Sequence, residues 1–581
     1  MEKNNNLSVH NAPRSMQAVL SDGYRLYAQN FTRLVRCSWI QAVIYALATG
    51  ASMTYCYTRL LPLMLSHDAS MPATLNVQTM ALPASDCRPH LTAQLKAGSF
   101  GLVSPFVRYV QNCIGKFGFS AMGEYTYAEN DYPYTIQNVT ETVSDRRTNS
   151  RMNSGHAELN FLWMPAPSSR LSGKLYYYDN DRQLPGQVRY YTNESHESLR
   201  DRNAFGQLQL QTHTESGWSL KAIVKQNWTE EIYRDGAYFG ATSKSAYWQR
   251  ETMLSACAMF TPGDHLAFDY SADYAYNSLN TNTVQVSHPW RHSVLQSLTG
   301  KWSSRRLTVM GRLLYSLYLN GIDEGQSARN MRRLSPSVSL SFKPLAGQSL
   351  YLRASLKNIF RVPTFNESYY FHYGSADLQS ESTNQYNVGV TYEGNPSPAS
   401  TVRITLDGYY NHVKDMIVAI PYNMFVWTCV NIGQVDVWGA DATMQATCSL
   451  GRGHRLSAMG NLTLQSVENK TNPESPNYGK QIAYYPRATG GASLSYENPF
   501  VNLSVHLTGV SSRWATNEHI ESTRVKGYQD AGVTVWRDFV LGVRRLGVRA
   551  DVKNVFNRQY EIVRLYPMPG RSFLFSLNYK F

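Results

Sequence analysis

The chain has 581 residues and a formal net charge of +13, but only 17% of its residues are charged, below the roughly 25% usual in soluble proteins. Its mean hydropathy of −0.38 excludes a bundle of transmembrane helices, since each such helix needs about 20 mostly apolar residues. The positive residues are scattered along the chain, so no nucleic-acid-binding patch is indicated.

The N-terminal ninety residues differ from the rest in their pattern of charged and apolar residues. The stretch 37–58 contains no charged residue, and Arg25, Arg33 and Arg36 lie before it. It is long enough to span a bilayer with the N-terminus in the cytoplasm. A secretory signal cleaved after Ala46–Ala48 and a buried core helix are open alternatives. We therefore divide this part into a basic segment (1–36), a hydrophobic helix or signal (37–65) and a linker (66–90).

Residues 91–581 have the pattern of many short strands. In 266–276, Leu266, Phe268, Tyr270, Ala272, Tyr274 and Tyr276 share one face. Such period-two alternation, with 40 tyrosines in the chain, is typical of a transmembrane antiparallel β-barrel with aromatic girdles. The length allows 22 strands with about 22 residues for each strand and its connection, or 16 with about 31. We predict an all-β fold with 22 strands, and a large soluble β protein is the alternative.

The chain ends on a strand, "RSFLFSLNYKF". Its apolar face consists of Phe573, Phe575, Leu577, Tyr579 and Phe581. An edge strand this apolar invites aggregation unless another strand pairs with it. The strand therefore either packs into a sandwich or closes a barrel in lipid.

Five phrases resemble, in the family's order, the barrel of TonB-dependent outer-membrane receptors, especially those of Bacteroidetes-type bacteria. They are "LKAGSFG" (95–101), "FRVPTFNESYYFHYGSADLQSES" (360–382), "NIGQVDVWGADATMQ" (431–445), "YYPRATGGASLSY" (484–496) and "DVKNVFNRQYEIVRLYPMPGRSFLFSLNYKF" (551–581). In the second phrase, Leu378 and Glu381 fill the family's Leu-x-x-Glu positions after the Arg-x-Pro-Thr segment. The resemblance implies a transporter for a large scarce nutrient of the siderophore, haem or cobalamin class. It also implies that the terminal strand is read by the barrel-assembly machinery, with outer-membrane lipid as a further partner.

The segment before the barrel departs from the family pattern. Family members carry a plug domain within the barrel and a TonB-contacting box in front of it, and residues 1–90 resemble neither. The resemblance therefore implies coupling to the TonB energising complex only if a plug is supplied. The alternatives are a passive outer-membrane pore and a non-functional truncated fusion, retained in the inner membrane through residues 37–65.

Few residues indicate a site. The sequence has no G-x-S-x-G, H-E-x-x-H, P-loop or dinucleotide fingerprint, so we predict no enzyme, resident cofactor or metal. The ligand-loop candidates are Tyr190, Tyr191, His372 and Tyr373, the tyrosines by stacking and His372 as a haem ligand in the manner of haem-uptake relatives. Cys429 and Cys448 would pair if their strands are neighbours, and otherwise they are isolated thiols.

Overall fold

The computed structural model describes residues 88–113, 116–138, 141–186, 188, 195–238, 241–282, 288–370, 374–421 and 427–581. The N-terminal segment, the hydrophobic stretch and most of the linker lie outside these residues. Within the described part, no helix is long and apolar enough to cross a membrane.

Twenty-two strands form one sheet. They are β1 (His90–Gly98), β2 (Leu102–Cys113), β3 (Phe117–Ala128), β6 (Met152–Ala166), β7 (Ser169–Leu184), β8 (Glu197–His213), β9 (Trp218–Tyr238), β10 (Ala241–Gly263), β11 (Leu266–Thr281), β12 (Trp290–Ser303), β13 (Leu307–Gly321), β14 (Met331–Phe342), β15 (Ser349–Arg361), β16 (Glu381–Ser397), β17 (Ser400–Pro421), β18 (Trp427–Gly451), β19 (His454–Asn469), β20 (Ala488–Glu497), β21 (Asn502–Val510), β22 (Tyr528–Leu541), β23 (Arg544–Lys553) and β26 (Ser572–Lys580). Small elements lie between them: the hairpins β4 (Pro133–Asn138) with β5 (Glu141–Arg146) and β24 (Glu561–Val563) with β25 (Tyr566–Pro567), the helix α3 (Phe365–Tyr369) and the 3₁₀ turn η2 (Glu521–Thr523).

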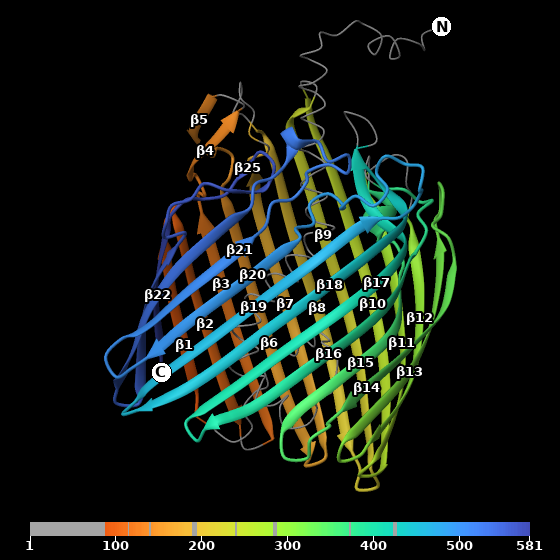
Figure 1. Ribbon diagram of the computed structural model, residues 1–581, viewed down its shortest axis with the longest axis vertical. Helices are drawn as coiled ribbons and strands as arrows, with labels where there is room; N and C mark the ends of the chain where they lie inside the picture. The colour runs from red at the N-terminus through yellow and green to blue at the C-terminus, as the bar shows by residue number, and fades with distance from the viewer. Residues whose placement is uncertain are drawn as a thin grey trace, which may run out of the picture.

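Each strand of the sheet pairs antiparallel with its neighbours along the chain, and the first strand pairs with the last. In that closing pair Thr92 lies opposite Lys580 and Gly98 opposite Leu574. The sheet is therefore a closed barrel, and the strands slant around it (Figure 1). The predicted 22-stranded antiparallel barrel is confirmed, and closure leaves no exposed edge at the terminal strand.

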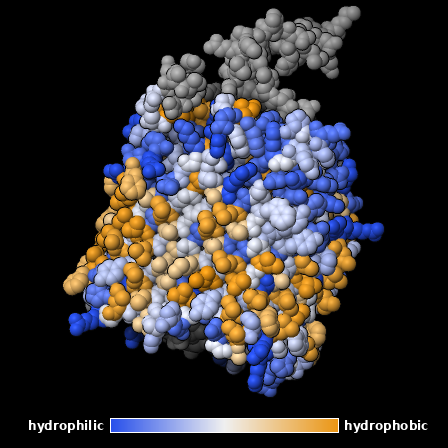
Figure 2. Space-filling model, viewed as in Figure 1, coloured by the Kyte–Doolittle hydropathy of each residue, from blue (hydrophilic) through white to orange (hydrophobic). Residues whose placement is uncertain are grey.

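The outer face of the barrel is apolar. Large side chains that stand exposed on it include Leu175, Leu298, Val388 and Phe573, with exposed fractions of 57% to 65%. Hydrophobic residues form a band over the lower part of the visible face, below a hydrophilic upper part (Figure 2). So wide an apolar surface is stable only in lipid, which excludes the soluble alternative.

The inner face carries small polar side chains instead. Buried examples are Ser104, Ser120, Ser297, Ser339, Ser355 and Ser576. In β26 they alternate with the lipid-facing side chains, so that Ser576 lies between Phe575 and Leu577. Period-two alternation thus separates a lipid face from a polar interior.

The connections differ between the two ends of the barrel. One end has short turns, such as 167–168, 398–399 and 452–453. The other end, which we call the loop end, has connections at 129–151, 185–196, 362–380, 470–487, 511–527 and 554–571. The hairpin β4–β5 and strand β25 stand at this end, above the wall strands (Figure 1).

The strands differ in length from the short strands that the sequence predicts: β10 has 23 residues and β18 has 25. About ten tilted residues cross the apolar layer, so the remainder extends the wall beyond it. Cys429 and Cys448 lie on the same strand, β18, about 60 Å apart at ~3.3 Å per residue. They are therefore too far apart to form a disulfide with each other.

Candidate functional site at the loop end

The β15–β16 connection begins with the single-turn helix α3. Thr364 is its N-cap, and its hydroxyl oxygen accepts a hydrogen bond from the Glu367 amide at 3.2 Å. The Glu367 carboxylate in turn accepts from the Thr364 amide at 2.8 Å. This reciprocal capping box satisfies two amides that a helix start leaves without partners. It explains why so short a helix forms at Phe365.

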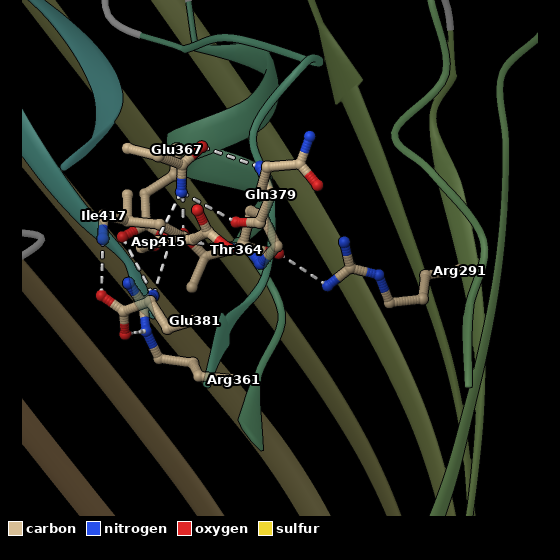
Figure 3. A network of polar contacts seen from close by, with 10 residues as sticks. Arg291, Arg361, Thr364, Glu367, Gln379, Glu381, Asp415 and Ile417 are labelled. Carbon is tan, nitrogen blue, oxygen red and sulfur yellow. Dashed lines mark hydrogen bonds and ion pairs between the residues drawn. The ribbon is translucent and has the colours of Figure 1, made fainter. Parts of the chain in front are cut away.

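Arg361, the last residue of β15, joins this helix to the wall (Figure 3). Its Nη1 donates to both Glu367 carboxylate oxygens, at 3.0 and 2.9 Å, and its Nε donates to Glu381 at 2.6 Å. Glu381 also accepts from the Ile417 amide of β17 at 2.6 Å. Charge-assisted bonds of this kind are about twice as strong as neutral ones. Both carboxylates are occupied in holding the connection.

Asn431 of β18 makes a second attachment. Its side chain accepts from the Gln379 amide at 2.8 Å and donates to the carbonyls of Gln379, at 3.0 Å, and Asp415, at 2.7 Å. Asp415 has a φ of 56°, and the pairs on either side of it, Lys414 with Gln434 and Met416 with Ile432, keep the same register. Its carbonyl accepts from Asn431, so the wall itself fixes the end of the connection.

The helix packs inward against the wall. Tyr370 stacks on Tyr247 of β10, with ring centroids 3.6 Å apart and 9° between the planes. Arg291 of β12 donates to the Pro363 carbonyl at 2.8 Å and lies 5.3 Å from the Phe365 ring centroid. The buried apolar cluster around them contains Tyr247, Leu279, Ala328, Phe365, Tyr369, Tyr370, Leu378, Ile417 and Cys429. The connection therefore folds into the barrel mouth instead of projecting outward.

A second group of loops meets across the mouth, and we call it the arginine loop cluster: residues 129–151, 185–188, 511–527 and 554–571. Tyr132 donates to the Pro567 carbonyl at 2.7 Å, and the Val188 amide donates to the Leu565 carbonyl at 2.9 Å. Tyr134, Ile136 and Val188 form its small apolar core, with Val143 and Leu565 against them. Loops far apart in the sequence thus form one packed layer.

Two arginines are buried in this cluster. Arg147 is 3% exposed and donates through Nη2 to the Gly186 carbonyl at 2.7 Å. Arg513 is 5% exposed, and its Nη2 donates to the Ile562 carbonyl. No hydrogen-bond acceptor reaches Nε of Arg147 or Nη1 of Arg513 among the described residues. A buried donor without an acceptor is costly, and burial lowers the pKa of Arg513. The cluster therefore holds two buried guanidinium groups whose donors are not all satisfied among the described residues.

The structure tests the sequence-predicted residues unevenly. The ligand-loop candidates Tyr190, Tyr191, His372 and Tyr373 all lie outside the described residues, so their roles stay predictions. The terminal strand has the predicted outward apolar face: Phe573, Phe575, Leu577 and Phe581 are exposed. Its role in assembly also stays a prediction. The sequence reading missed Arg361 and Glu367 as a pair, although both lie in the quoted phrase 360–382. It missed Arg147 and Arg513, which carry no sequence signal.

Comparison with known proteins agrees with this architecture. The family described as "TonB dependent receptor-like, beta-barrel" matches residues 115–555. The chain belongs to this family. It is therefore an outer-membrane transporter of the TonB-dependent class in a bacterium, and not an enzyme. Proteins of this class bind small nutrient ligands and interact with TonB.

Solved structures share the fold at low sequence identity. The copper transporter OprC is 15% identical with a TM-score of 0.68, over 85% of this chain and 80% of its own. The FrpB iron transporter of Neisseria meningitidis is 15% identical with a TM-score of 0.66, over 86% and 82%. The ferric citrate transporter FecA is 15% identical with a TM-score of 0.65, over 87% and 80%. At this identity the likeness concerns the fold.

Proposed function

We propose that this receptor takes up an anionic metal chelate of the siderophore class, which enters through the loop end. The observation that carries the proposal is the pair of buried arginines, Arg147 and Arg513, each with a guanidinium nitrogen that lacks an acceptor. A carboxylate or catecholate oxygen of the ligand would accept from these nitrogens. Such charge-assisted bonds are favourable in a site that excludes water.

The named cargoes of similar structures support the same chemistry. They include a copper transporter, an iron transporter, a ferric citrate transporter and a siderophore receptor. Ferric citrate is a carboxylate complex, so a site with buried arginines suits that kind of ligand. Haem and cobalamin, the other predicted nutrient classes, would instead depend on large apolar contacts.

Binding to the purified protein in detergent micelles tests the proposal. Intrinsic tryptophan fluorescence would be titrated with ferric citrate, with a ferric tricatecholate, with a neutral ferric trihydroxamate and with cobalamin. We expect at least one anionic complex to bind, and Arg147→Gln and Arg513→Gln each to weaken it about tenfold or more, the usual cost of losing a buried charged partner. Binding of the neutral complexes or of cobalamin alone, or no effect of either substitution, would contradict the proposal.

Uptake in cells separates energised transport from a passive pore. Accumulation of the radiolabelled chelate would be compared in strains with and without a functional TonB complex, beside conductance in planar bilayers. Energised transport predicts accumulation only with TonB and no steady current. The passive pore stays a prediction of the sequence, and a large ligand-independent current would favour it.

A further inference from the structure

The inner wall of the barrel has sectors of opposite charge. Inward side chains are those that alternate along a strand with the exposed apolar residues of the outer face. On β10 and β11 they include three carboxylates that form no ion pair among the described residues, Glu251, Asp269 and Asp273. On β13 to β15, neighbouring strands further around the wall (Figure 1), they include the cations Arg312, Arg353 and Lys357. An anion inside the barrel is therefore repelled by the first sector and attracted to the second.

Three cations follow one another down the inner face of β15. Arg361, Lys357 and Arg353 are four residues apart, which is about 13 Å for each step, and they lead from the loop end toward the short turns. Arg361 is held between two carboxylates, and Arg353 forms an ion pair with Asp407 at 2.7 Å. Lys357, between them, forms no hydrogen bond or ion pair among the described residues. The middle cation of the row is therefore the one that is free to bind an anion.

Arg312 of β13 lies one strand away from this lysine. Register places Arg312 opposite Ser337 of β14, and Ser337 opposite Lys357 of β15. The two cations are therefore about 10 Å apart at Cα, with only a short hydroxyl side chain between them. Nε of Arg312 donates to the Ser297 hydroxyl at 2.8 Å, and no other acceptor among the described residues contacts this guanidinium. Its two Nη nitrogens can therefore donate to an anion that lies over Ser337.

Serines line the wall around the two cations. Ser339 and Ser355 lie opposite each other, next to the row of Ser337 and Lys357. The buried serines of this part of the wall are 3% to 6% exposed: Ser297, Ser335, Ser339 and Ser355. Because these side chains are short, the long cationic side chains have room to lie over them. A serine hydroxyl can also donate to an oxyanion.

The outward neighbours show the depth of this group in the membrane. Leu313, Val338 and Leu356 are adjacent in sequence to Arg312, Ser337 and Lys357, and their exposed fractions are between 42% and 55%. They belong to the apolar surface that faces lipid. The two cations therefore lie behind the apolar band, about 13 Å below Arg361. They are separate from the arginine loop cluster, which consists of loops at the loop end.

We propose that Arg312, Ser337 and Lys357 form an inner anion site, which binds the anionic chelate after it has left the loop end. This inference rests on the proposed function, because it takes the same class of ligand. Carboxylate or catecholate oxygens of the chelate would accept from the guanidinium, the ammonium and the hydroxyl, and charge-assisted bonds of this kind are strong. The chelate would also screen the repulsion between the two cations. Its route then follows β13 to β15 and avoids the carboxylates of β10 and β11.

Equilibrium dialysis of the full-length protein in detergent micelles tests the inner anion site. Radiolabelled ferric citrate is the probe, and a ferric tricatecholate is used in a second series. We expect two bound equivalents in the wild type, one tight and one weaker. Arg312→Gln/Lys357→Gln should weaken only the second, about tenfold or more, because each cation within about 4 Å attracts an anion even in water-like surroundings. Arg312→Lys/Lys357→Arg keeps both charges and should retain both equivalents.

A matched control removes two inward cations from another part of the wall. Lys221 and Lys225 lie on the inner face of β9. The row of Lys221 continues through β10 to Ser271 of β11, between Asp269 and Asp273, so carboxylates offset its charge. The variant Lys221→Gln/Lys225→Gln should keep both equivalents at wild-type affinity. Heat-modifiable migration on a gel verifies that each variant is folded.

The outcomes separate the inner anion site from the proposed function. Arg147→Gln/Arg513→Gln should lose the tight equivalent and keep the weaker one. A tight equivalent that survives this change would contradict the proposed function. The inner anion site is overturned, with the proposed function intact, if the wild type binds only one equivalent. It is also overturned if the weaker equivalent survives Arg312→Gln/Lys357→Gln, or falls as much in the control.

Discussion

Two groups of charged side chains at the loop end differ in the partners of their arginines. In the β15–β16 connection, Arg361 bonds to Glu367 and Glu381, and both carboxylates also accept from backbone amides. In the arginine loop cluster, Arg147 and Arg513 donate to backbone carbonyls, and among the described residues each has one nitrogen without an acceptor. The first group sets one arginine between two carboxylates, whereas Arg147 and Arg513 have no carboxylate partner among the described residues.

This difference suggests different roles for the two groups. A buried ion pair with all its hydrogen bonds made costs much to break, because the remaining charge is left without a partner. An unpartnered donor carries a desolvation cost that only another molecule can remove. We therefore interpret the Arg361 network as the attachment of the connection to the wall, and the arginine loop cluster as the surface that receives an anionic ligand.

The largest predicted effect comes from breaking the network of Arg361, Glu367 and Glu381. Glu367→Ala removes two bonds to Arg361 and the capping box together. We expect the opening free energy of residues 362–380 to fall by about 3 kcal/mol, which is about a hundredfold faster amide exchange. Hydrogen–deuterium exchange followed by mass spectrometry measures this directly.

The control for that variant is Glu474→Gln, in an exposed part of the connection 470–487. It should leave amide exchange everywhere within about 0.5 kcal/mol of the wild type. If Glu367→Ala proves equally silent, the network is not what holds the connection, and the contrast between the two groups fails.

A smaller loss of stability is expected in the arginine loop cluster. Arg513→Gln removes a bond to the backbone but leaves no carboxylate unpaired, so residues 554–571 should open more easily by only about 1 kcal/mol. A saturating anionic chelate should slow exchange of these residues in the wild type and not in the variant. Arg524→Gln, in the same loop, alters an exposed ion pair with Glu521 and should keep the ligand effect. A ligand effect that survives Arg513→Gln would remove this residue from the site.

The sequence predicts the wall well because every barrel strand obeys the same constraint. One face meets lipid and the other a polar interior, so alternation is visible in single strands such as β11 and β26. The pairing of β26 with β1 follows from the same physics, since an apolar edge must be covered. Strand ends were predicted less well, since residues above the apolar layer need not alternate. This is why the sequence leaves the pairing of Cys429 and Cys448 open.

The site was less predictable because burial in a loop depends on partners far along the chain. Arg513 is buried by the segment that contains Ile562, and Arg147 lies against Gly186. Neither contact has a local pattern. Arg361 and Glu367 lie close in sequence, in an Arg-x-Pro-Thr segment, and the capping box between Thr364 and Glu367 has a recognisable spacing. Their pairing could have been predicted from that spacing.

The smallest predicted effect is a pH dependence of the loop that contains Glu561, near Arg513. Burial raises the pKa of Glu561 above its usual value of 4.5, although Arg564, Arg513 and Lys526 oppose the shift. Because the folded-state pKa is the higher one, the protonated form favours the folded loop. That contribution is complete below about pH 4.5 and is lost as the pH rises through the raised pKa.

Amide exchange of residues 561–567, corrected for the intrinsic rate, should therefore show weaker protection at about pH 7.5 than at about pH 4.5. In Glu561→Gln, which is neutral at both values, the dependence should be flatter. A bound anion at Arg513 would sharpen the contrast, since it weakens the attraction that favours ionised Glu561 and so raises its pKa further. If amide exchange depends on pH in the same way in both proteins, ionisation of Glu561 does not affect the stability of the loop. The charge of the arginine loop cluster would then be confined to its arginines.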